Sequence, residues 1–125
     1  MRIQRCFTDE AKSPYEGIEF RTTTSEIRNP DGTIVFRLDD IAVPADWSQV
    51  AADILAQKYF RKAGVPAALR PVKDENIPTW LWAHEADEPR LDDMPEGKRL
   101  GPEKDARQVF DRLAGTSTYW GWKGG

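Results

Sequence analysis

Apolar and polar residues alternate between positions 17 and 28, with the period of two that is typical of a half-buried β-strand. The sequence NPDG follows at 29–32 and favours a tight turn, because Pro presets φ near −65° and Gly tolerates the left-handed conformation. Residues 33–38, TIVFRL, are rich in β-branched and aromatic side chains. The pattern therefore predicts an antiparallel hairpin in which residues 26–28 pair with residues 33–38.

The spacing of apolar residues predicts a helix from about Trp47 to Ala63. Asp46 is the expected N-cap, and Gln49 three residues later completes a capping-box pattern. Gly64 and Pro66 are expected to end the helix. One apolar stripe runs along it, made of Trp47, Val50, Ala51, Ile54, Leu55 and Tyr59.

A second helix is predicted from about Pro102 to Ala114. Proline suits the first helical position, and Gly115 is expected to stop the helix. Its apolar face is made of Ala106, Val109, Phe110 and Leu113. Residues 77–82, IPTWLW, form a short aromatic segment before it.

The remaining segments are polar and irregular. Residues 1–16 are expected to form an extended arm, and residues 17–84 to hold the hairpin and the first helix. Residues 85–101, with many charges, two prolines and two glycines, are expected to form a mobile linker. Residues 102–125 then provide the second helix and an aromatic end. The fold class that follows is a small single α+β domain with an antiparallel β-hairpin, two main helices and irregular arms.

Composition and charge exclude several classes of function. With 18 basic and 21 acidic residues and a net charge of −3, the chain lacks the clustered positive charge expected of a nucleic-acid-binding protein. No apolar run approaches about 18 residues, so we expect no membrane span. The single cysteine cannot form an internal disulfide, which fits a location in the reducing cytoplasm.

No set of residues has the spacing of an active site. The one histidine, His84, and the one cysteine, Cys6, are far apart, and each is expected to be an ordinary exposed side chain rather than a metal ligand or a redox group. The carboxylate pairs at 39–40 and 92–93 are expected at a solvated strand end and in the linker. The glycines within 121–125 precede no helix that could hold a phosphate. We therefore expect no catalytic, cofactor-binding or metal-binding residue in this chain.

The aromatic residues are the remaining unusual feature, and two interpretations stay open for them. Trp47 and Trp80 can simply enlarge a small core. Tyr119, Trp120 and Trp122 fit that interpretation less well, because terminal residues are usually frayed and polar. Tyr and Trp are common anchors of buried interfaces, so we expect these three side chains to be partly exposed and to form a docking edge.

Long stretches of the chain resemble the N-terminal domain of class II ribonucleotide reductases, the bacterial enzymes that depend on adenosylcobalamin. The resemblance covers nearly the whole chain and is weakest across the charged segment before the second helix. The stretches that carry it are SPYEGIEF at 13–20, SEIRNPDG at 25–32, WSQVAADILAQKYFRKAGVP at 47–66, QVFDRLAG at 108–115 and YWGWKGG at 119–125.

The resemblance implies a large enzyme that reduces ribonucleotides to deoxyribonucleotides. In that family, homolysis of the cobalt–carbon bond of adenosylcobalamin generates a thiyl radical on a cysteine inside a ten-stranded α/β barrel, and a cysteine pair supplies the electrons. These cysteines, the cobalamin pocket and the substrate phosphate loop belong to the barrel, which is expected beyond Gly125. Cys6 matches none of the catalytic cysteines, so no catalytic or cofactor residue carries over to this chain.

Two hypotheses follow for the function. In the first, the chain is the N-terminal part of the reductase and packs on the catalytic barrel, so that ribonucleotide substrate and deoxynucleotide effector are met only through the full enzyme. In the second, it is a stand-alone protein-interaction module without reductase activity. Adding the barrel separately should restore activity under the first hypothesis and have no effect under the second.

The chain alone is expected to be inactive under both hypotheses. We predict no measurable deoxynucleotide formation when the chain is incubated with adenosylcobalamin, a dithiol and a ribonucleotide, because it lacks the cysteines that the chemistry needs. Chromatography of the nucleotide products is the measurement. Cobalamin-dependent turnover by this chain would show that the expected absence of a site is wrong.

Overall fold

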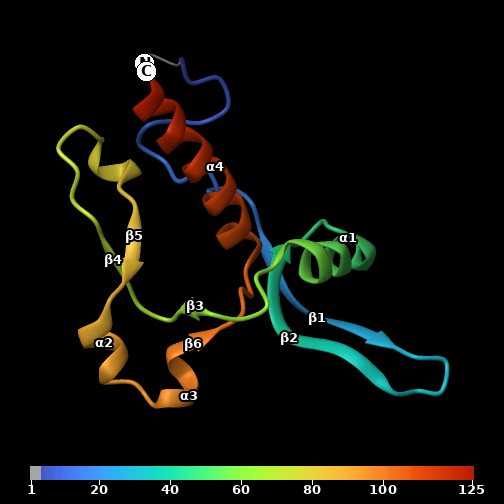
Figure 1. Cartoon of the computed structure of the whole chain (residues 1–125). Helices are drawn as coiled ribbons and strands as arrows, with labels where there is room; N and C mark the ends of the chain where they lie inside the picture. The colour runs from blue at the N-terminus through green and yellow to red at the C-terminus, as the bar shows by residue number, and fades with distance from the viewer. Residues whose placement is uncertain (1–3) are drawn as a thin grey trace.

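The computed structural model describes residues 4–125 and has the predicted α+β class (Figure 1). Residues 1–3 of the predicted arm lie outside the described residues. The strands are β1 (Phe20–Arg28), β2 (Ile34–Pro44), β3 (Val65–Pro66), β4 (Leu69–Pro71), β5 (His84–Ala86) and β6 (Leu100–Gly101). The helices are α1 (Gln49–Ile54), the π-helical η1 (Leu55–Tyr59), the 3-10 helix η2 (Thr79–Leu81), α2 (Glu88–Asp92), α3 (Glu96–Arg99) and α4 (Ala106–Gly124).

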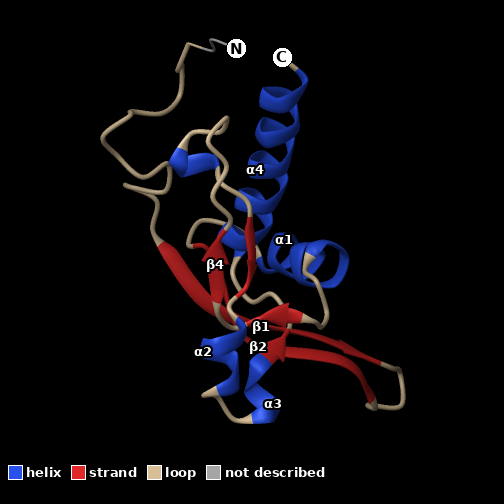
Figure 2. Ribbon diagram, turned by 60° about the vertical axis from the view of Figure 1, so that its left-hand side comes forward, coloured by secondary structure: helices blue, strands red, loops and turns tan. Residues whose placement is uncertain are grey.

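Strands β1 and β2 form the predicted antiparallel hairpin, with Glu26 opposite Arg37. The turn closes as the sequence predicts: the Asn29 amide donates to the Thr33 carbonyl at 2.8 Å, and Gly32 adopts φ +87°. Two further antiparallel pairs, β3 with β6 and β4 with β5, are short. Both views show the turn end of the hairpin extending away from α4 (Figures 1 and 2).

The second strand is longer than predicted, because it continues through a β-bulge. Asp39 and Asp40, expected at a solvated strand end, both lie within β2 and face the single residue Thr24 on β1. Asp40 adopts φ +56°, and the Thr24 hydroxyl donates to the Asp39 carboxylate at 3.0 Å. A bulge of this kind bends a strand and increases its twist. Beyond it, Ile41 and Val43 are fully buried.

The first helix is shorter than predicted at both ends. Its N-cap is Ser48, not Asp46, since the Trp47 amide already donates to the Pro44 carbonyl and keeps the preceding residues in a turn. The Ser48 hydroxyl accepts a hydrogen bond from the Ala51 amide at 3.2 Å. The helix then loosens into the π-helical segment η1 and ends at Tyr59 instead of residue 63.

The second helix starts later and ends later than predicted. It begins at Ala106 and not at Pro102, with Asp105 as its N-cap, and a capping box forms with Gln108. Burial by itself raises the pKa of Asp105, but hydrogen bonds from the side chain and amide of Arg107 outweigh it and hold that pKa below its usual value. The predicted stop at Gly115 is wrong: α4 runs to Gly124, because glycine only weakens a helix interior and tertiary contacts can outweigh that cost.

The charged segment 85–101, for which the composition predicts a mobile linker, contains regular structure, and its mobility stays a prediction. Helices α2 and α3 and strand β6 lie in it. The Asp87 side chain caps α2 by accepting from the Arg90 amide, and Leu91 is buried. The charged side chains of this segment are mainly exposed, so a high charge density here is compatible with short helices.

The core lies where β2, α1, η1 and α4 meet. Its buried members are Ile41, Val43, Ala52, Leu55, Ala56, Phe60, Ala106 and Val109, with Phe20, Leu38 and Trp47 packed against them. Trp47 therefore enlarges the core as expected, whereas Trp80 is mostly exposed and does not.

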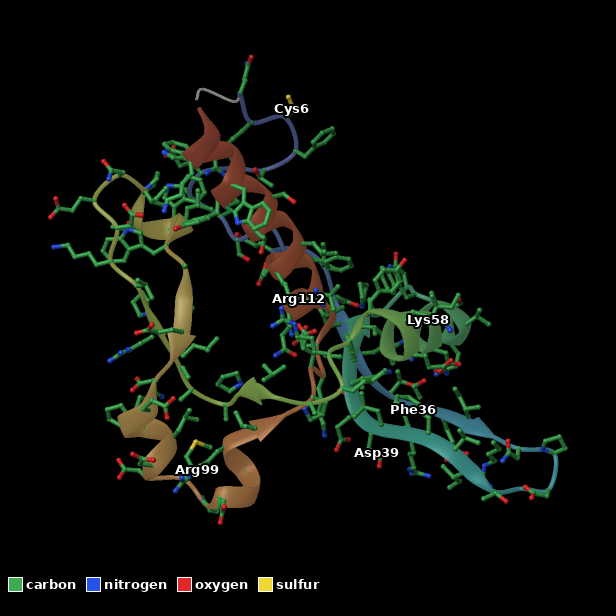
Figure 3. All side chains as sticks on the ribbon, in the orientation of Figure 1. Cys6, Phe36, Asp39, Lys58, Arg99 and Arg112 are labelled. Atoms are coloured by element: carbon green, nitrogen blue, oxygen red, sulfur yellow. The ribbon has the colours of Figure 1, made fainter. Side chains whose placement is uncertain are left out.

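A buried carboxylate joins the two main helices. Glu103 is only 3% exposed, and its carboxylate accepts hydrogen bonds from the Arg61 amide at 2.8 Å and from the Arg112 guanidinium at 3.0 Å. Arg112 also donates to the carbonyl of Tyr59 at 3.0 Å, at the end of η1. Figure 3 shows Arg112 on the half of α4 nearest the hairpin. This network holds the start of α4 against the end of η1.

Replacing Glu103 by alanine should lower the free energy of unfolding by about 3 kcal/mol, because it leaves the Arg112 charge and the Arg61 amide without their acceptor in a buried site. Urea denaturation followed by circular dichroism measures the loss. The control is Glu85→Ala, since the Arg70–Glu85 pair is about half exposed and such pairs contribute about 1 kcal/mol or less. Equal losses in the two variants would contradict the role given to Glu103.

Candidate interface along helix α4

One face of α4 continues beyond the core of the domain. Ala106, Val109, Phe110, Leu113 and Trp120 fall within about 100° of the helix circumference at 3.6 residues per turn. The first two are buried, and exposure then rises along the stripe from 36% at Phe110 to 51% at Leu113 and 73% at Trp120. The apolar face of α4 is therefore buried in the core at its start and exposed to solvent at its end.

The first half of this stripe forms one wall of an open apolar groove of about 330 Å³ between α4 and the α1–η1 segment. Its walls are Trp47, Ala51, Ile54, Leu55, Tyr59, Val109, Phe110 and Leu113. Trp47 and Phe110 meet edge to face across it, with ring centroids 5.9 Å apart. Ile54 and Tyr59 on its α1–η1 side are each more than half exposed. The groove is an apolar surface that residues 4–125 leave uncovered.

The opposite side of the last turns of α4 packs against the segment that contains η2. The Trp122 ring meets Trp80 edge to face at a centroid distance of 6.3 Å. The Lys123 ammonium lies 3.4 Å from the Asp74 carboxylate and 5.1 Å from the centre of the Tyr119 ring. The Asp74 carboxyl has a pKa below its usual value, mainly through a hydrogen bond from the Asn76 amide and further through Lys123.

These contacts divide the predicted docking edge in two. Tyr119 and Trp122 are half-buried and contact their own chain, whereas Trp120 points out of the domain on the stripe described above. All three retain exposed surface, as expected, and their role in an interface stays a prediction. The sequence suggests one cluster because the three lie within four positions, but a helix separates neighbours by about 100°.

The other end of α4 is anchored by the N-terminal segment. The Tyr15 hydroxyl donates to the Asp111 carboxylate at 2.7 Å, and its ring packs edge to face on Phe20. Burial and that acidic partner raise the pKa of Tyr15 above its usual value. The Arg107 guanidinium lies over the Phe20 ring at 4.1 Å. Residues 4–19 contain no helix or strand, yet Tyr15 fastens them to α4.

The residues considered for chemistry do not come together. His84 is exposed on β5, and Cys6 is exposed as a free thiol near the far end of α4 (Figure 3). Asp39 pairs with Arg37 and Asp92 with Arg99. Within residues 4–125, no three His, Cys, Asp or Glu side chains are grouped as a metal site would require. No helix in that range is both long and apolar enough to cross a bilayer.

The groove is the feature that sequence reasoning missed. Each of its two walls is the apolar stripe that the sequence predicts for one of the two helices. The sequence shows both stripes, but it does not show that they face each other across a groove.

Comparison with known proteins places these features in one family. Residues 21–125 match the family described as class II vitamin B12-dependent ribonucleotide reductase. The vitamin B12-dependent ribonucleotide reductase of Bradyrhizobium diazoefficiens is 60% identical over 125 residues, which is 100% of this chain and 10% of that protein. The enzyme of the same name from Agrobacterium fabrum is 62% identical over 124 residues, and that from Streptomyces avermitilis is 32% identical over 90 residues, covering 99% and 68% of this chain.

Trp122→Ala should release the last turns of α4, whereas Trp120→Ala should not. An edge-to-face aromatic pair contributes about 1 kcal/mol beyond its buried area, and Trp122 forms one while Trp120 is mostly in solvent. Hydrogen exchange of the amides of residues 116–124 should therefore accelerate in the Trp122 variant alone. Equal exchange in both variants would contradict the assignment of the two faces.

Proposed function

This chain belongs to the class II vitamin B12-dependent ribonucleotide reductases, and we propose that it is the N-terminal, non-catalytic part of such an enzyme. The chain spans about a tenth of the length of the curated relatives that it matches. The proposed activity of the whole enzyme is the reduction of ribonucleotides to deoxyribonucleotides by thiyl-radical chemistry. In this proposal the chain packs on the catalytic barrel, and only the full enzyme binds the ribonucleotide substrate and the deoxynucleotide effector.

The cofactor proposed for the whole enzyme is adenosylcobalamin, and the residues of this chain do not fit it. His84, the one imidazole, is exposed on a short strand, so no enclosed site surrounds it. Buried side-chain nitrogen and oxygen atoms among residues 4–125 all have hydrogen-bond partners, so none is left for the polar edge of a corrin. The groove of about 330 Å³ has an almost wholly apolar lining and no charged side chain to orient such a ligand. We therefore assign no step of the reaction to this chain.

The observation that carries the proposal is the exposed end of the α4 stripe in a chain of this family. Trp120, 73% exposed, lies on the same face as the buried Val109. Large aromatic side chains are typical anchors where two protein surfaces meet. The proposal makes Trp120 the main contact with the barrel, while Tyr119 and Trp122 support it from the side that packs on Trp80. It also places the enzyme in the reducing cytoplasm, where the free thiol of Cys6 persists.

A chimeric enzyme tests the proposal. In the Agrobacterium fabrum reductase, the 124 matched residues are replaced by this chain, and a second variant lacks them altogether. We expect cobalamin-dependent deoxynucleotide formation by the chimera within about tenfold of the parent enzyme, and a loss of at least about 100-fold in the truncated variant, because an exposed apolar surface on the barrel would be left without its partner.

The measurement is product formation at fixed concentrations of adenosylcobalamin and dithiol. An inactive chimera beside an active parent enzyme would contradict the proposal and favour a stand-alone interaction module. Full activity in the truncated variant would show that the barrel needs no such part.

A further inference from the structure

We propose that the groove between α1, η1 and α4 is a second docking site, which receives the apolar face of a helix from the part of the reductase that lies outside this chain. The inference rests on the proposed function and adds the surface and the kind of segment that binds there. It concerns the groove walls Ile54, Tyr59, Phe110 and Leu113, which are distinct from Trp120 near the other end of α4.

Both walls of the groove carry exposed apolar side chains. Ile54 and Leu113 are each 51% exposed, and Tyr59 is 55% exposed, on facing walls of one open apolar groove. Removing the remaining exposed apolar area of these side chains from water would stabilise a complex. Singly exposed apolar residues are normal, but a contiguous group of this kind marks an interaction site.

The shape of the groove suits a helix. Its two walls are helical, and a groove between two helices accepts the ridge of side chains on a third helix. A volume of about 330 Å³ is enough for two or three large aliphatic side chains spaced three or four residues apart. The 3–4 spacing of an amphipathic helix therefore suits it.

The rest of the reductase is the source of the helix that we propose for the groove. About nine-tenths of the relatives' length lies outside the matched region, so the reductase itself supplies far more surface than a second copy of this chain would. The groove opens on the same side of α4 as the stripe that ends at Trp120, so one partner surface can cover both. Trp47 and Phe110 hold the groove walls together edge to face, which makes the site preformed.

The test uses the chimeric reductase and two charge substitutions of matched exposure. Leu113→Lys places an ammonium in the groove, and Val35→Lys places one on the hairpin at a residue that is 60% exposed and lies outside the groove. In the chain alone, circular dichroism should give equal melting temperatures for both variants, because both positions face water. In the chimera, Leu113→Lys should lower reductase activity by at least about tenfold, because burying an unpaired charge is unfavourable, while Val35→Lys should stay within about twofold.

Hydrogen exchange supplies a readout that does not depend on activity. Amides of residues 49–59 and 106–114 should exchange at least about tenfold more slowly in the chimera than in the chain alone, and Leu113→Lys should remove that protection. Equal exchange in chimera and chain, or equal effects of the two lysine variants, would overturn the inference. If the unsubstituted chimera is active in those cases, the proposed function stands and only the second docking site fails.

The same variants distinguish a second copy of the chain as the occupant. If the chain alone sediments as a dimer that Leu113→Lys converts to a monomer, a second copy fills the groove and the inference is wrong. If Leu113→Lys removes the protection of the groove amides in the chimera while the amides of residues 116–124 stay protected, the groove is supported as a docking site separate from Trp120.

Discussion

The Glu103 carboxylate is the constraint on which the arrangement of the domain depends. It accepts from the Arg61 amide and from Arg112, so residues that are 42 positions apart in the sequence are held within hydrogen-bond distance in a buried site. A two-stranded hairpin and two short strand pairs cannot bury a core without helices packed on them. The Glu103 network orients α4 relative to that core, and the orientation of α4 in turn positions the groove and the exposed Trp120.

Helix α4 contributes both to the core and to an exposed surface, because it is longer than the core that it covers. At 19 residues it measures about 28 Å, and only its first turns meet the hairpin and α1. Tyr15 and Glu103 fix one end, and Trp80 and Asp74 support the other. The helix thus carries an apolar stripe from the interior of the domain to its surface while both of its ends are held by contacts within the chain.

Local patterns in the sequence predicted the hairpin and the existence of both helices. The predicted apolar stripes contain only three of the eight buried core residues, which are Leu55, Ala106 and Val109. The errors arose where a distant contact outweighs a local signal. Gly115 looks like a helix stop, but contacts made by Trp122 and Lys123 keep the helix going. Asp46 and Ser48 are both good caps, and only the turn after β2 selects Ser48. The groove could not be predicted, because it depends on how two helices lie relative to each other.

The π-helical turn at Leu55–Tyr59 has a consequence for how this region can change in evolution. The Phe60 amide reaches back to the Leu55 carbonyl at 3.1 Å, and a turn of this kind holds one residue more than an α-helical turn. The additional residue allows Phe60 to enter the core while its neighbour Tyr59 borders the groove. Deletion of one residue here would rotate the following side chains by about 100° about the helix axis, so that Phe60 would no longer face the core and Tyr59 would no longer border the groove. We therefore expect a change of length at this turn to disturb the packing more than a change of residue type.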